Sequence, residues 1–149
     1  LKDELSIFRR RIIGFIFAGI RLSGVPCGLT LCADRRWLAE AIENLLDNAV
    51  KYCDRGNVIQ VFAEETPVFL CIYVKNNGPG IRISEQGLIF QRFYRSKSAS
   101  SESGLGIGLY LTRKIIAKHG GYVDLRSAPG KGADFRMQVA HWSIYLIFF

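Results

Sequence analysis

The chain lacks the residue patterns that several kinds of site and segment require. Its four cysteines have no paired C-x-x-C spacing and only two histidines accompany them, so a set of zinc ligands is excluded. We expect these cysteines to be buried free thiols of a protein in a reducing cytosol. No secretory signal is evident at the N-terminus. The apolar stretches 12–20 and 142–149 fall short of the roughly 20 residues that span a bilayer. We therefore expect a cytoplasmic location, with any membrane anchor of the parent protein in a missing upstream segment.

The charge and composition favour a globular domain with an anionic partner. The net charge is +7, and 49% of the residues are hydrophobic and 12% aromatic, which argues against disorder. With 149 residues the chain can form one domain with an ordinary core. Nucleotide phosphates, an acidic protein surface or nucleic acid would each suit this charge. The basic residues are scattered, with only residues 9–11 as a run, so nucleic acid is not expected as a partner.

Apolar patterns and turn residues predict alternating hairpins and helices. Strands are expected in pairs at 20–23 with 29–33, at 58–64 with 68–75, and at 122–127 with 133–139. Helices are expected at 35–53, capped by Asp34, at 84–93, and from Gly108 to about His119. Residues 1–18 fit either an amphipathic helix or a strand. This order predicts an α+β fold, a two-layer α/β sandwich in which a mixed, mostly antiparallel sheet is covered by one layer of helices.

The helix expected at 35–53 carries polar side chains along one side. Glu40, Asn44, Asn48 and Lys51 recur at steps of three and four residues, which places them on one face. The opposite face is apolar, with Leu38, Ile42, Leu45, Leu46, Ala49 and Cys53. Two carboxamides and an amine can hold a hydrated magnesium ion and the phosphates that it bridges. The alternative is a surface helix whose polar side chains are solvated.

Glycine-rich segments occur twice. Gly104, Gly106 and Gly108 lead directly into a helix, where free backbone N–H groups and the helix dipole favour phosphate. The segment is not a Walker loop, and a flexible loop is the alternative. The second segment, N-N-G-P-G-I at 76–81, follows an apolar strand, so Asn76 would lie at the end of the strand and could read the edge of a base. A tight turn stabilised by the Asn side chain is the alternative there.

An aromatic motif lies between the two glycine segments. We expect Phe90, Phe93 and Tyr94, in F-x-x-F-Y, to pack the short helix onto the core. Arg95 follows directly and heads the serine-rich loop 95–103, from which it could reach a terminal phosphate.

In their order and separations these motifs resemble the N, G1, F and G2 boxes of bacterial sensor histidine kinases. The chain is thus similar to the catalytic ATP-binding domain (HATPase_c) of that family, within the GHKL superfamily, over about residues 20–139. The resemblance implies the Bergerat ATP-binding fold, with ATP and Mg²⁺ as ligands. It also implies a single catalytic domain over 1–149, with 1–19 a linker remnant or a helix, 140–149 an apolar tail, and no dimerisation or phosphoacceptor domain.

The resemblance also implies a role for each matching position. Asn48 would be the magnesium ligand, and the catalytic group would be Asn48, Lys51 and Arg95, of which Arg95 stabilises the transferring γ-phosphoryl group. Tyr52 would lie against the adenine, and loop 95–103 would be the ATP lid. The full set of implied nucleotide-binding residues is Asn44, Asn48, Lys51, Tyr52, Asn76, Gly78, Gly80, Ile81, Phe93, Arg95, Gly104, Leu105, Gly106, Ile107, Gly108 and Leu109.

The sequence departs from the family pattern at two points. Asn76 stands where the family has an adenine-reading Asp, and we expect binding to be retained because the Asn carbonyl can also accept a hydrogen bond. The phosphoacceptor motif, His followed by an acidic residue, is missing, and His119 is interpreted as structural. The resemblance therefore implies transfer to a histidine on a separate dimerisation and histidine phosphotransfer domain or chain, with a response regulator downstream.

Other functions fit parts of the pattern. GHKL hydrolases of the gyrase, Hsp90 or mismatch-repair type place a water-activating Glu four residues before the magnesium-binding Asn. Here that position is Asn44, and Glu40, one turn further back, would be poorly placed to substitute, so transfer is favoured over hydrolysis. A catalytically impaired nucleotide-binding or protein-interaction module is the main alternative. An anti-sigma-factor serine kinase fits the motif around Arg95 less well.

Overall fold

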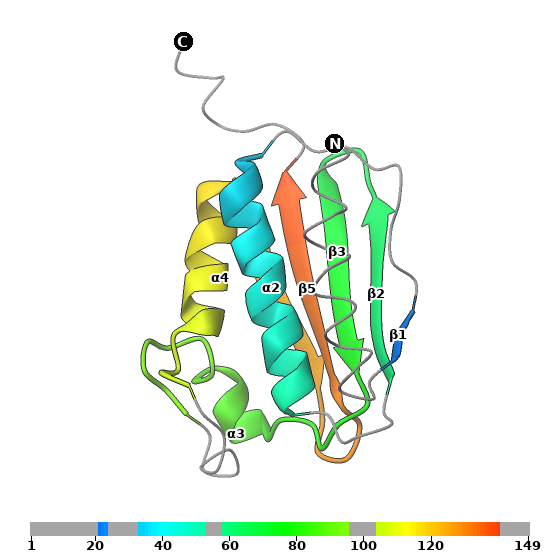
Figure 1. Ribbon diagram of the computed structural model, residues 1–149, viewed down its shortest axis with the longest axis vertical. Helices are drawn as coiled ribbons and strands as arrows, with labels where there is room; N and C mark the ends of the chain where they lie inside the picture. The colour runs from blue at the N-terminus through cyan, green and yellow to red at the C-terminus, as the bar shows by residue number, and fades with distance from the viewer. Residues whose placement is uncertain (1–20, 24–32, 53–57, 96–103, 141–149) are drawn as a thin grey trace.

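The computed structural model describes residues 21–23, 33–52, 58–95 and 104–140 (Figure 1). They form a five-stranded sheet in the order β1-β2-β3-β5-β4. The strands are β1 (Arg21–Ser23), β2 (Val58–Glu65), β3 (Phe69–Asn76), β4 (Tyr122–Ser127) and β5 (Ala133–Ala140). Strand β1 is parallel to β2, and the other neighbouring pairs are antiparallel. The predicted mixed, mostly antiparallel sheet is therefore confirmed.

The predicted pairing of 20–23 with 29–33 is not tested, and β1 has a partner that was not predicted. Arg21–Ser23 is a strand, but it pairs in parallel with β2, with Arg21 opposite Val58, and Ala33 is not part of a strand. Residues 29–32 lie outside the described part of the chain. A parallel pair needs a long crossover connection, here one that includes the helix at 35–51. A pairing of that kind has no local signal in the sequence.

Helices cover one face of the sheet. The long helices α2 (Arg35–Lys51) and α4 (Gly108–Lys118) lie side by side over it, and α3 (Ile83–Gln86) lies near the C-terminal end of α2 (Figure 1). Thr112 of α4 donates hydrogen bonds from Oγ1 to the carbonyl oxygens of Gly108 and of Ala41 in α2, at 2.9 and 3.4 Å. No helix in the described ranges is long and apolar enough to cross a membrane.

The core lies between the helices and the sheet. Its fully buried members include Leu45, Ile59, Val61, Val74, Phe135, Met137 and Ile116. Strand β5 contributes to this core with every second residue from Ala133 to Val139, because successive side chains of a strand point to opposite faces of the sheet. The two-layer sandwich predicted from the sequence is confirmed.

Helix α2 begins as predicted, because the Asp34 carboxylate accepts hydrogen bonds from the backbone N–H groups of Arg36 and Trp37 at 3.0 and 3.1 Å. It ends at Lys51, two residues before the predicted end, and Cys53 lies outside the described residues. The predicted apolar face is buried or half-buried, and it also includes the fully buried Ala41.

The helix predicted at 84–93 is wrong in extent, since α3 covers only Ile83–Gln86 and turns follow it. Gly87, which directly follows α3, has low helix propensity, and the backbone at Phe93 is left-handed (φ 65°). Helix α4 ends one residue before His119, and the hairpin of β4 and β5 forms as predicted.

Candidate nucleotide-binding site

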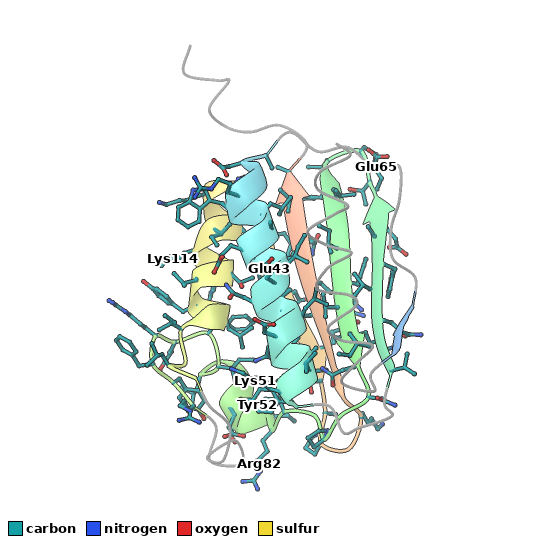
Figure 2. All side chains as sticks on the ribbon, in the orientation of Figure 1. Glu43, Lys51, Tyr52, Glu65, Arg82 and Lys114 are labelled. Carbon is teal, nitrogen blue, oxygen red and sulfur yellow. The ribbon has the colours of Figure 1, made fainter. Side chains whose placement is uncertain are left out.

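A cavity of about 560 Å³ lies where α2 ends, α3 and α4 begin and the 76–81 loop leaves β3. The predicted site residues that line it are Asn44, Asn48, Lys51, Tyr52, Asn76, Gly80, Ile81, Arg95, Gly104, Leu105, Gly106, Ile107, Gly108 and Leu109. The structure thus brings the four motifs together around one space. Figure 2 shows Lys51 and Tyr52 at the end of α2, close to α3.

The polar face of α2 forms one wall, because Glu40, Asn44, Asn48 and Lys51 all line the cavity. The Nδ2 amino group of Asn44 is buried and has no hydrogen-bond partner in the described part of the chain. A buried donor without a partner is costly, and an anionic oxygen in the cavity would satisfy it. This wall therefore suits a phosphate.

The start of α4 forms the facing wall. Ile107, at the N-cap position, makes no side-chain hydrogen bond to the first turn, so the N–H groups of that turn remain available to a ligand. A Cβ atom on Gly108 would lie 3.6 Å from Oδ1 of Asn44, and one on Gly104 would lie 2.9 Å from Nζ of Lys51. The glycine loop therefore lies directly beside the polar face of α2, and the residues present fit a nucleotide phosphate chain.

Asn76, at the end of β3, is 5% exposed. Its Oδ1 atom accepts a hydrogen bond from the backbone N–H of Gly78 at 3.0 Å, which is the Asn-stabilised turn considered from the sequence. Gly78 itself does not line the cavity. It is buried under the carbonyl oxygen of Tyr52, with which a Cβ atom would overlap. Gly78 thus brings the loop against the end of α2.

The rest of the loop is fixed on the β4–β5 hairpin. Gly80 has a left-handed φ of 75°, and a Cβ atom there would overlap the carbonyl oxygen of Ala128. The backbone N–H of Ile81 donates to Oγ of Ser127 at 2.8 Å. The Gln86 side-chain amide donates to the carbonyl oxygens of Ile81 and Ser127, both at 2.9 Å. These bonds give the loop one conformation at the cavity.

The aromatic motif divides into three different environments. Phe90 packs edge-to-face on Phe135, with ring centroids 6.4 Å apart, so its predicted core role is confirmed. Phe93 is 61% exposed and does not line the cavity, so its predicted packing on the core is wrong and the structure does not bring it to the site. The backbone N–H of Phe93 donates to the carbonyl oxygen of Gly106 at 2.9 Å. The left-handed backbone at Phe93 turns its ring outward, and the ring centroid lies 4.8 Å from the guanidinium carbon of Arg92.

Tyr94 lines the cavity, and its hydroxyl donates to Oε1 of Glu85 at 3.1 Å. Burial, this hydrogen bond and the negative charge of Glu85 raise the pKa of the Tyr94 phenol. Arg95 follows and also lines the cavity. The bond between Phe93 and Gly106 joins the residues on either side of segment 96–103. Of the predicted lid, 95–103, only Arg95 belongs to the described residues.

Several lining residues were not predicted as site residues. They are Glu40, Asp47, Pro79, Arg82, Glu85, Ile89, Tyr94, Leu111, Pro129, Ala133 and Phe135. Pro79 and Arg82 directly adjoin predicted positions and could have been included. Ala133 and Phe135 reach the site only because β5 lies next to β3, and no local pattern reveals that.

His119 does not line the cavity. Its Nε2 accepts a hydrogen bond from the backbone N–H of Asp34 at 3.1 Å, and its Nδ1 lies 2.7 Å from the carbonyl oxygen of Ile115. Both ring nitrogens are therefore used within the fold, as the structural interpretation predicted. His141 lies outside the described residues.

Comparison with known proteins identifies the class. Residues 33–142 match the family described as "Histidine kinase-, DNA gyrase B-, and HSP90-like ATPase". The chain belongs to this family, whose members bind ATP, and the predicted resemblance is confirmed.

The relatives that the chain resembles are sensor kinases. The chain is 35% identical over 102 residues to the sensor protein kinase PmrB of Pseudomonas aeruginosa, covering 68% of this chain and 21% of that protein. It is 41% identical over 105 residues to the signal transduction histidine-protein kinase/phosphatase MprB of Mycobacterium sp. (strain KMS), covering 69% of this chain and 20% of that protein. A solved structure of a mycobacterial sensor histidine kinase MprB superimposes with a TM-score of 0.75 at 26% identity, covering 93% of this chain and 90% of that one.

The chain therefore spans about a fifth of the length of these curated relatives. Its family is that of the ATP-binding catalytic domains of sensor histidine kinases, and its fold is theirs.

Proposed function

We propose that this chain is a catalytic domain that binds ATP with Mg²⁺ and transfers the γ-phosphoryl group to a histidine on a separate domain or chain. The observation that carries the proposal is the cavity in which the polar face of α2 meets the glycine loop at the start of α4. It combines carboxamides, an amine and free helix N–H groups on the phosphate side with apolar side chains and one buried amide on the base side.

The base side is formed by Ile81, Ile89, Leu109 and Phe135, with Asn76 at the strand end. Apolar walls with few polar groups are typical of sites that hold a flat heteroaromatic ring. Tyr52, at the end of α2, adds an aromatic side chain to this side.

On the phosphate side, Asn48 would offer its carboxamide oxygen to Mg²⁺, and Asn44 Nδ2 and Lys51 Nζ would donate to phosphate oxygens. Mg²⁺, when bound, neutralises phosphate charge and orients the γ-phosphoryl group. Arg95 lines the same cavity and would stabilise the charge that develops on that group. In the transfer, an imidazole nitrogen of the acceptor histidine forms a bond to the γ-phosphorus, the bond to the bridging oxygen breaks, and ADP leaves.

Hydrolysis is the second candidate, and one observation favours it. Glu40 lines the cavity, although the sequence suggested that it would be poorly placed to activate water. Asn44, at the position of the hydrolase Glu, has no basic group. The variant Glu40→Gln separates the two candidates, because it should leave histidine phosphorylation unchanged and abolish any ATP hydrolysis that uses Glu40 as base.

For the parent protein we propose a cytoplasmic location of this domain. Its proposed partners are a dimerisation and histidine phosphotransfer domain and a downstream response regulator. The support is that the relatives are sensor kinases and that no histidine among the described residues lines the cavity.

The test is transfer of radioactive γ-phosphate from ATP to a separately produced dimerisation and phosphoacceptor domain of a similar sensor kinase. We expect label on that domain, stable to base and labile to acid as a phosphohistidine is, and no label with Asn48→Ala. Release of inorganic phosphate without labelled protein, abolished by Glu40→Gln, would replace the kinase by a hydrolase. Binding of ATP with neither product would leave a nucleotide-binding interaction module.

A further inference from the structure

The side chain of Asn76 has one orientation that its surroundings permit. The atom 3.0 Å from the Gly78 nitrogen faces an N–H donor, so it has to be the acceptor Oδ1 and not the amino group Nδ2. The Asn76 side chain is almost fully buried, with 5% of the residue exposed, and so it has little freedom to turn.

Because Oδ1 faces Gly78, Nδ2 occupies the other branch of the carboxamide. Within the described residues Nδ2 of Asn76 has no hydrogen-bond partner. The side-chain atoms there that are both fully buried and without a partner are Asn44 Nδ2 and Asp134 Oδ1, so Nδ2 of Asn76 is not fully buried. Since Asn76 lines the cavity, its unpartnered amino group is available to a ligand held there. The base therefore meets a hydrogen-bond donor at this position.

A hydrogen-bond donor at position 76 affects which purine base the cavity can bind. Adenine carries an amino group, a donor, at its six position, whereas hypoxanthine and guanine carry an acceptor oxygen there. An Asp at this position would accept from the Gly78 N–H with one oxygen and from the adenine amino group with the other. The Asn76 amino group instead matches an acceptor, which is the six-position oxygen in a 6-oxopurine and only the adjoining ring nitrogen in adenine, and the adenine amino group would have to share Oδ1 with the Gly78 N–H.

We propose that this site binds 6-oxopurine nucleoside triphosphates at least as well as ATP, with Asn76 as the residue that determines the selectivity. The proposal rests on the proposed function, because it concerns the base of the nucleotide held in the same cavity. Discrimination of this kind comes from donors and acceptors left without partners in a buried site, and one such mismatch changes affinity by about tenfold or more.

The test is calorimetric titration with ATP and with ITP, both with Mg²⁺. ITP is the sharpest probe, because it differs from ATP only at the six position and the adjoining ring nitrogen. We expect the wild-type domain to bind ITP at least as tightly as ATP. Asn76→Asp should shift the ratio of the two affinities toward ATP by about tenfold or more. The matched control is Asn77→Asp, an exposed neighbour that does not line the cavity, and it should leave the ratio unchanged.

The outcomes distinguish the two proposals. Wild-type binding of ATP about tenfold tighter than ITP would overturn the inference and leave the proposed function intact, as would equal effects of the two Asp variants on the ratio. Failure of the folded wild-type domain to bind either nucleotide would overturn both. The wild-type ratio alone decides the inference if Asn76→Asp does not fold.

Discussion

His119 and Asp34 join the two long helices at the end remote from the cavity. The backbone N–H of Asp34, the N-cap of α2, donates to Nε2 of His119 at 3.1 Å, while Nδ1 on the other side of the ring lies 2.7 Å from the carbonyl oxygen of Ile115 in α4. The ring thus gives the Asp34 N–H its partner and adds a second donor to the Ile115 carbonyl, which also accepts from the backbone N–H of His119, and it does so as the tautomer protonated at Nδ1.

We expect His119→Ala to lower the free energy of unfolding by about 1–2 kcal/mol, because the N–H of Asp34 loses its partner and the carbonyl of Ile115 keeps only the backbone N–H of residue 119. Denaturant unfolding measures this, with the exposed neighbour Lys118→Ala as the control. Transfer of label to an added phosphoacceptor domain should persist in His119→Ala. If the variant lost transfer while it remained folded, the structural role of His119 would be wrong.

The sequence predicts the polar face of α2 and its cap because both signals are local, a period of three to four residues and an Asp just before it. It fails for β1, whose parallel partner β2 follows a crossover and has no local signature. It fails at Phe93 because the outward turn of the ring depends on a left-handed backbone and on the carbonyl of Gly106, which is distant in the sequence.

Three glycines should differ sharply in their tolerance of alanine. Gly80→Ala combines a left-handed φ of 75° with overlap on the Ala128 carbonyl, so we expect a loss of at least about 3 kcal/mol of unfolding free energy. Gly130 has a φ of 76° with nothing near its Cβ position, so Gly130→Ala should cost about 1–2 kcal/mol.

Gly87 is the matched control for these two variants. It has helical backbone angles and open space around its Cβ position, so Gly87→Ala should raise the unfolding free energy by about 0.4–1 kcal/mol. Thermal or denaturant unfolding of the three variants measures the order. Equal effects at Gly80 and Gly87 would contradict the described conformation of the 76–81 loop.

Asn44→Ala should separate stability from ligand binding. Removal of the buried, unpaired Nδ2 group should leave the ligand-free domain as stable or about 1 kcal/mol more stable, since an unsatisfied donor is costly and Ala favours the helix. The same change should weaken ATP binding by about tenfold, because a phosphate oxygen loses a donor. Unfolding and titration on one sample measure both effects, and a large loss of stability would show that Asn44 is a packing residue.

Tyr73 should make stability depend on alkaline pH. Burial, the hydrogen bond of its hydroxyl to Oε2 of Glu64 at 2.9 Å and the charge of that carboxylate raise the pKa of the phenol, while Arg136 lowers it. The folded domain therefore holds this proton more tightly than the unfolded chain. The stabilisation is complete below about pH 10 and is lost as the pH rises through the folded pKa.

Tyr73→Phe should accordingly cost only a few tenths of a kcal/mol at about pH 8, since the pair is solvent-screened. Above about pH 10 the wild-type domain should lose stability faster than the variant. Urea unfolding across this range measures the difference, and Glu64→Gln should reduce it. A difference that does not change with pH would exclude the assigned role of the phenol proton.

The central claim is that the cavity between α2 and the glycine loop holds ATP with Mg²⁺, and calorimetric titration with and without Mg²⁺ tests it most directly. We expect magnesium-dependent binding of ATP and of a non-hydrolysable analogue by the wild-type domain. Binding should be lost in Asn48→Ala and kept in Glu43→Ala, a residue of α2 that does not line the cavity. Two results would contradict this claim: ATP binding by the folded domain that is the same without Mg²⁺ and in Asn48→Ala, or no ATP binding at all.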